Sequence, residues 1–148
     1  MSSGWQNEYK GDVTASEAYE LVRTEKGAQL VDVRTRPEWS FVGVPDLSEA
    51  GKEIVLAEWQ RYPAMEVAAD FVATLERELA KRGTTKGDTV LFLCRSGVRS
   101  LAAAQAMIAA GWVNSRNVSG GFEGPADGER HRGTVDGWKA AGLPWVQS

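Results

Sequence analysis

The stretch "DTVLFLCRSGVRSLAAAQAMIAA", residues 88–110, decides the fold of this chain. Residues 90–93 are apolar without alternation, which is typical of a parallel strand whose two faces are both covered by helices. Residues 100–110 are rich in alanine and are followed by Gly111, which indicates a helix with a defined end. A strand that leads through a short loop into a helix is one unit of a parallel α/β domain.

The N-terminal part of the sequence carries the same kind of signals. Thr14, with Glu17 three residues later, forms a capping-box pattern that opens a helix, and Gly27 is placed to end that helix. Residues 28–33, "AQLVDV", then predict a short buried strand that ends before Pro37, which we interpret as a breaker.

The middle and the end of the chain complete the pattern. Residues 41–63 are irregular, with a strand indicated at residues 53–59. Residues 64–82 predict one long helix, because apolar side chains recur every fourth residue at Val67, Phe71, Leu75 and Leu79. A strand around residues 116–120 and a short helix around residues 135–142 close the chain.

This alternation predicts a three-layer α/β domain, with a mainly parallel central sheet and helices on both faces. The chain has 148 residues, enough for one domain that buries roughly two-thirds of the surface of the unfolded chain. We expect a polar N-terminal tail at residues 1–10 and a single domain at residues 11–148.

Composition argues against several classes of protein. With 17 basic and 20 acidic residues and a net charge of -3, the chain has no basic character that would favour nucleic-acid binding. The N-terminus lacks the apolar core of a secretion signal, and no apolar run is long enough to cross a bilayer. We expect a cytoplasmic protein with no nucleic-acid or membrane partner. A single cysteine without metal-ligand spacing predicts no metal and no cofactor.

That single cysteine, Cys94, is the first residue beyond the carboxyl end of the predicted strand, where ligands bind in parallel sheets. Gly97 permits a tight turn in which backbone N–H groups surround the sulfur. Arg95 and Arg99 supply electropositive surroundings that favour a thiolate. We therefore predict a nucleophile, although most free cysteines are small core residues and that alternative remains open.

Three motifs, taken in order, resemble the rhodanese-like domain family of single-domain sulfurtransferases. The first is "LVDVRTRPEW" at residues 30–39, and the second is "CRSGVRS" at residues 94–100. The third is "NVSGGF" at residues 117–122, followed by "GWKAAGLPW" at residues 137–145. The resemblance extends over nearly the whole chain and implies the three-layer rhodanese-like fold.

The resemblance also implies a reaction. The Cys94 thiolate would take a sulfane sulfur from a small anionic donor such as thiosulfate and pass it to cyanide or a thiol, and a protein acceptor is a further expectation. Asp32 and Arg34 are expected to support the neighbouring loop without taking part in the chemistry. The residues expected to bind substrate are Arg95, Ser96, Gly97, Val98, Arg99 and Ser100.

Two segments depart from the family pattern and predict a changed entrance to the site. "FVGVPDLSEAG" at residues 41–51 replaces the usual Gly-His-Ile-Pro-Gly turn. Residues 123–136 separate "GGF" from Trp138 and read as a mobile surface loop. His131 lies in this loop and is expected to be solvated, without a catalytic role.

Two other functions remain open at this point. A cysteine-dependent phosphatase on the same scaffold would carry cysteine, five residues and then arginine, but here Ser100 stands in that place and Arg99 comes one residue earlier. A rhodanese-like module without catalytic activity could use the same face to bind a protein.

Overall fold

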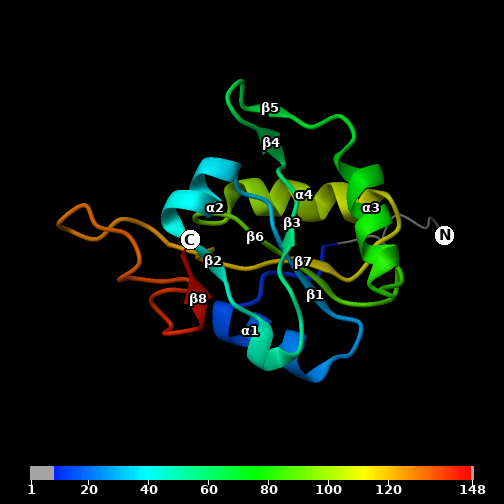
Figure 1. The fold of residues 1–148 in the computed structure, drawn as a ribbon, viewed down its shortest axis with the longest axis horizontal. Helices are drawn as coiled ribbons and strands as arrows, with labels where there is room; N and C mark the ends of the chain where they lie inside the picture. Colours follow the sequence, from blue (N-terminus) through cyan, green and yellow to red (C-terminus); the bar gives the residue numbers. More distant parts are fainter. Residues whose placement is uncertain (1–8, 148) are drawn as a thin grey trace.

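The computed structural model of the chain describes residues 9–147, and a four-stranded parallel sheet lies at its centre (Figure 1). The strand order is β3-β1-β6-β7, and every neighbouring pair runs parallel. The predicted parallel sheet is therefore confirmed. Its strands are β1 Gln29–Asp32, β3 Val55–Leu56, β6 Val90–Leu93 and β7 Ser115–Asn117.

Helices cover both faces of this sheet, as the sequence predicts. Figure 1 shows α3 and α4 on one side of the strands and α1 on the other. The main helices are α1 Ala15–Thr24, α2 Arg36–Val42, α3 Phe71–Lys81 and α4 Val98–Ala109, with a short 3-10 helix, η2, at Ser48–Ala50. Two small antiparallel pairs join β2 Val44–Pro45 to β8 Trp145–Val146 and β4 Gln60–Arg61 to β5 Glu66–Val67.

The side chains of β6 alternate between two buried clusters. Val90 and Phe92 pack with α3 and α4, whereas Leu91 and Leu93 pack with α1 and the C-terminal segment. Successive side chains of a strand point to opposite faces, and Cys94 continues this alternation into the α4 cluster. The packing of the core thus determines that the Cys94 side chain points toward α4 at the end of the strand.

The capping box predicted at the start of α1 is present. Glu17 N donates to Thr14 Oγ1 at 3.1 Å, and Thr14 N donates to Glu17 Oε1 at 2.8 Å. These two bonds satisfy backbone and side-chain groups that a helix end would otherwise leave unpaired. The helix ends at Thr24, shortly before Gly27.

The long helix predicted for residues 64–82 is wrong in its first part. β5 pairs with β4 as a hairpin, and α3 begins only at Phe71. Val67 is 52% exposed, although it falls on the same four-residue repeat as the buried Phe71. Ala68 N donates to Trp59 O at 2.9 Å, so the chain after β5 is bonded to the residue before β4, and the helix begins only beyond this contact.

β1 ends at Asp32, before Pro37, as predicted. Pro37 lies in the first turn of α2, where a missing N–H costs nothing and the ring's fixed φ suits a helix. One expectation near the C-terminus is corrected. Residues 135–142 form turns and contain no helix, and the buried Trp138 anchors them through its Nε1–H, which donates to Pro144 O at 2.7 Å.

Most of the predicted N-terminal tail, residues 1–8, lies outside the described residues. The remaining two residues contact the domain: Asn117 N donates to Tyr9 Oη at 2.8 Å, and Lys10 Nζ donates to Asn114 Oδ1 at 2.7 Å. Among residues 9–147, no helix combines the length and the apolar character required to span a membrane.

Candidate functional site

The loop that carries Cys94 joins the carboxyl end of β6 to the start of α4. The helix begins at Val98, two residues earlier than predicted, so Arg99 and Ser100 belong to its first turn. Asp32, at the carboxyl end of β1, is in register with Leu93 at the end of β6. Side chains from both strand ends therefore gather at one edge of the sheet.

The sulfur of Cys94 lies inside the loop, within hydrogen-bond distance of two groups that can donate to it. Gly97 N donates to Sγ at 3.1 Å, and the Oγ of Ser100 lies at hydrogen-bond distance, also 3.1 Å. Cys94 is only 2% exposed, and Ser100 is fully buried. Gly97 has a φ of 122°, which a residue with a side chain rarely adopts. Donors converging on a sulfur at a helix N-terminus stabilise a negative charge on that sulfur.

The outer side of the loop is held by the "GGF" motif. Phe122 N donates to Cys94 O at 2.8 Å, and the backbone N of both Glu123 and Gly124 donates to Arg95 O at 3.0 Å. Gly121 permits this contact, because a Cβ at that position would lie only 2.4 Å from Cys94 O. The C-terminal motif thus fixes the backbone of the cysteine loop.

Arg99, expected to bind substrate, forms a bidentate ion pair with Glu38 of α2. Its Nη1 and Nη2 donate to Oε1 and Oε2 at 2.7 and 2.9 Å. Burial alone would raise the pKa of Glu38, but hydrogen bonds from Arg99 and Thr35, with the Arg99 charge, lower it to about 2. The ion pair also raises the pKa of Arg99.

The role of Glu38 was missed at the level of sequence. The signal was present, because Glu38 is the acidic residue of the first motif and follows Thr35 by three residues. Thr35 N donates to Glu38 Oε1 at 3.1 Å, as in a capping box. What the sequence does not give is the partner, Arg99, which lies 61 residues away along the chain.

A cleft of about 500 Å³ opens beside the loop, and we call it the site cleft. Arg95 is exposed on its rim, and within residues 9–147 its guanidinium forms no ion pair. Ser96 and Val98 are also exposed on the loop. The lining includes Glu38 and Val42 from α2, Gln60 and Met65 from the β4–β5 hairpin, and Arg95 and Arg99.

Asp32 and Arg34 form a fully buried ion pair behind the loop. Arg34 Nη2 donates to Asp32 Oδ2 at 2.7 Å and to Gly43 O at 2.6 Å. The guanidinium also lies 4.3 Å from the centre of the Phe122 ring. The pair therefore connects β1, the end of α2 and the C-terminal segment, and neither residue lines the site cleft.

The segment at residues 123–136, orange in Figure 1, projects from the body of the domain and is held by its own hydrogen bonds. Gly133 N donates to Glu123 O and Arg132 Nη1 donates to Gly124 O, both at 2.6 Å. His131 is exposed, and its backbone N donates to Asp127 Oδ1 at 2.9 Å. The predicted mobility of this segment stays a prediction.

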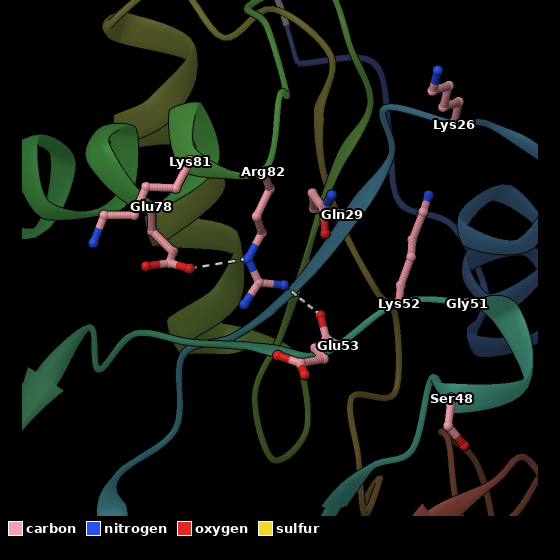
Figure 2. Close-up of a pocket in the computed structure, with 9 residues that line it drawn as sticks. All are labelled: Lys26, Gln29, Ser48, Gly51, Lys52, Glu53, Glu78, Lys81 and Arg82. Carbon is pink, nitrogen blue, oxygen red and sulfur yellow. Dashed lines mark hydrogen bonds and ion pairs between the residues drawn. The ribbon is translucent and has the colours of Figure 1, made fainter.

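Another hollow, of about 720 Å³, lies at the opposite, amino end of β1. Figure 2 shows that Arg82 turns toward Glu78 and the backbone of Glu53, with hydrogen bonds of 3.0 and 2.6 Å. Lys52 Nζ donates to two backbone carbonyls, at 2.6 Å each. Cys94 follows the carboxyl end of β6, at the other edge of the sheet, so this hollow is separate from the cysteine loop.

Comparison with known sequences identifies the family. Residues 14–126 match the Rhodanese-like domain family. The uncharacterized protein RC0915 of Rickettsia conorii is 35% identical over 134 residues, which are 90% of this chain and 95% of the relative. The uncharacterized protein RP600 of Rickettsia prowazekii is 35% identical over 135 residues, with the same coverage of both chains.

Solved structures agree with this assignment. The crystal structure of Rv0390 from M. tuberculosis has a TM-score of 0.82 and 44% identity, and the match covers 95% of this chain and 100% of that chain. The polysulfide-sulfur transferase homodimer of Wolinella succinogenes shares the fold, with a TM-score of 0.58, 21% identity and coverage of 93% and 79%. The fold, the ordered motifs and the family match lead to one conclusion: this chain belongs to the rhodanese-like domain family.

Proposed function

We propose that this protein is a sulfurtransferase that carries a sulfane sulfur on Cys94. The observation that carries the proposal is the pair of groups, Gly97 N and Ser100 Oγ, that meet the buried sulfur at 3.1 Å. Such a site suits a nucleophile that is an anion both before and after it accepts sulfur. The family match and the shared fold of the Wolinella polysulfide-sulfur transferase support the same class of reaction.

The reaction proceeds by two displacements at sulfur. The Cys94 thiolate attacks the outer sulfur of thiosulfate, a new S–S bond forms, and the old S–S bond breaks as sulfite leaves with its electron pair. An acceptor such as cyanide then attacks the outer sulfur of the persulfide. The bond to Cys94 breaks, thiocyanate leaves, and the thiolate is restored without an external oxidant or reductant.

Arg95 is the cation that attracts the anionic donor to the site cleft. Arg99 forms an ion pair with Glu38, whereas Arg95 is exposed on the rim of the site cleft and has no carboxylate partner among residues 9–147. A protein thiol is a further acceptor in this proposal, and we place the reaction in the cytoplasm, where a lone cysteine stays reduced.

The test is turnover of thiosulfate and cyanide, with thiocyanate as the measured product. Intact-mass spectrometry after thiosulfate treatment should show one added sulfur, which cyanide removes. Cys94→Ser should gain no sulfur and produce no thiocyanate. Sulfur uptake by Cys94→Ser, or a folded wild type that takes up none, contradicts the proposal. Hydrolysis of an aryl phosphate that disappears in Cys94→Ser would instead identify a phosphatase.

A further inference from the structure

A buried polar pair lies directly behind the cysteine sulfur. Ser100 Oγ is 3.1 Å from Cys94 Sγ and 2.5 Å from Asn117 Oδ1. Ser100 is fully buried, and Asn117 is 3% exposed. Asn117 ends β7, the strand beside β6, so two neighbouring strand ends and the first turn of α4 meet at the Ser100 hydroxyl.

The Ser100 hydroxyl has one proton and two neighbours that can accept it. If the proton goes to the Asn117 oxygen, the sulfur receives no bond from the hydroxyl. If the proton goes to the sulfur, the Ser100 oxygen needs a donor on its other side, because two unprotonated oxygens 2.5 Å apart repel each other. The amide nitrogen of Asn117 is such a donor. The direction of the Ser100 proton is therefore linked to the orientation of one amide.

The surroundings allow the Asn117 amide to change orientation while its backbone stays fixed. Asn117 N donates to Tyr9 Oη at 2.8 Å, and Asn117 O accepts from Val13 N at 2.9 Å. Beside the amide lies Gly97, where a Cβ would stand 3.6 Å from Nδ2. Residue 97 therefore places no side chain against Nδ2, and exchanging Oδ1 with Nδ2 leaves the outline of the amide nearly unchanged.

We propose that Asn117 is a positioning residue that acts on the sulfur through Ser100. While the sulfur is a neutral thiol, Asn117 Oδ1 accepts the Ser100 proton. When the thiol proton has left to solvent, the amide presents Nδ2–H to Ser100 Oγ, and the hydroxyl donates to the anionic sulfur. Asn117 itself touches neither donor nor acceptor. The inference deepens the proposed function and rests on it, because the thiolate it stabilises is the nucleophile of sulfur transfer.

Other charged groups also act on this sulfur, and the comparison of variants must hold them constant. The ion pair between Arg99 and Glu38 lies on one side, and the buried pair formed by Asp32 and Arg34 lies behind the loop. Arg95 lies on the exposed side. A substitution at Asn117 leaves all of these groups in place, so they cancel when variants are compared.

The experiment measures how fast iodoacetamide alkylates the protein, by intact mass, over a neutral-to-alkaline pH range. The chain has one cysteine, so the rate reports on Cys94 alone. In Asn117→Asp the carboxylate accepts and does not donate, so it holds the Ser100 proton away from the sulfur. We expect about tenfold slower alkylation near neutral pH and a profile displaced by about one pH unit to higher pH.

Asn117→Leu is the matched variant, because it removes both the acceptor and the donor at similar volume. The sulfur is then the only partner of Ser100, and we expect a slowing of at most about threefold. A purely structural role predicts the reverse order, since leucine removes more native hydrogen bonds than aspartate does. If Asn117→Leu slows alkylation as much as Asn117→Asp, the proposal is overturned.

A second pair of variants separates the proposed relay from a direct effect of the new charge. In a Ser100→Ala background, only the direct repulsion between the new carboxylate and the thiolate remains, so Asn117→Asp should slow alkylation several-fold less than it does when Ser100 is present. The same tenfold slowing in that background would contradict the proposal. Thermal melts confirm folding, and Asn117→Ala replaces Asn117→Leu if the leucine variant does not fold. Alkylation needs no sulfur donor, so its outcome is independent of whether thiosulfate turns over.

Discussion

Arg99 places both terminal nitrogens of its guanidinium on the two carboxylate oxygens of Glu38, at 2.7 and 2.9 Å. A bidentate pair of this kind fixes the orientation of both side chains. It joins the first turn of α4 to α2, so the arginine that ends the cysteine loop is part of the framework of the site. Arg95 belongs to the same motif as Arg99, but it has no carboxylate partner among residues 9–147.

We expect Arg95→Gln and Arg99→Gln to have different effects. An exposed charge near the donor contributes about 1 kcal/mol, so Arg95→Gln should raise KM for thiosulfate roughly fivefold at low salt, and added salt should reduce the difference. Arg99→Gln leaves the half-buried Glu38 without its cation and should mainly lower the free energy of unfolding. Steady-state kinetics at two salt concentrations and thermal melts check both. Identical kinetic effects of the two variants would show that the assignment of roles is incorrect.

The Glu38 carboxylate should make stability sensitive to acid. Its pKa falls from 4.5 to about 2 on folding, so its contribution is complete above pH 4.5 and is lost as pH falls toward 2. The contribution is at most about 3 kcal/mol, and less because the side chain is partly exposed. Glu38→Gln should therefore be less stable at neutral pH and lose less stability between pH 4.5 and 2.

Urea unfolding at a series of pH values measures this effect. Glu129→Gln, at an exposed position of the 123–136 segment, controls for the loss of one negative charge. If Glu38→Gln keeps the wild-type acid dependence, Glu38 is not the group responsible.

Gly121→Ala should disrupt the site from behind. The residue has a φ of 60°, and a Cβ would lie 2.4 Å from Cys94 O and 2.7 Å from the carbonyl carbon of Arg95. The backbone of the cysteine loop must move, so we expect the free energy of unfolding to fall by about 2 kcal/mol or more. We also expect the sulfur-transfer activity to be lost. Gly128→Ala is the control, because nothing lies within 4 Å of its Cβ position. Equal effects of the two substitutions would contradict the close contact.

The 123–136 segment should affect access without taking part in the chemistry. Asp127 accepts hydrogen bonds from His131 N at 2.9 Å and Thr134 Oγ1 at 2.8 Å, so Asp127→Ala should loosen the segment. We expect KM for a protein thiol to change while turnover of thiosulfate and cyanide stays the same. His131→Ala should leave both reactions unaltered. A collapse of thiosulfate turnover in folded His131→Ala would give the histidine a role that we do not assign to it.

The parts of the fold that the sequence predicts well depend on local signals. The apolar run of β6 and the alanine-rich α4 are specified by adjacent residues, and both are confirmed. The capping box of α1 is likewise complete within residues 14–17. The position of Cys94 at the strand end follows from the same continuous pattern.

The parts that were missed depend on contacts that are distant in sequence. The repeat through Val67 and Phe71 indicates a helix, yet the β4–β5 pairing takes Val67 away from the core before α3 starts. The pairing of Glu38 with Arg99 and the approach of Asn117 to Ser100 join residues that are 61 and 17 positions apart. No local periodicity encodes such pairs.

The bonds from residues 122–124 to the carbonyls of Cys94 and Arg95 bear on whether the cysteine loop is a portable motif. The C=O and the following N–H of a peptide unit point in opposite directions, so tying these carbonyls outward also orients the amides of residues 95 and 96. A graft of residues 94–99 onto another strand–helix junction would keep every side chain and lose this orientation. The reactive unit to transplant is therefore the loop together with residues 122–124, two segments that only the folded domain brings together.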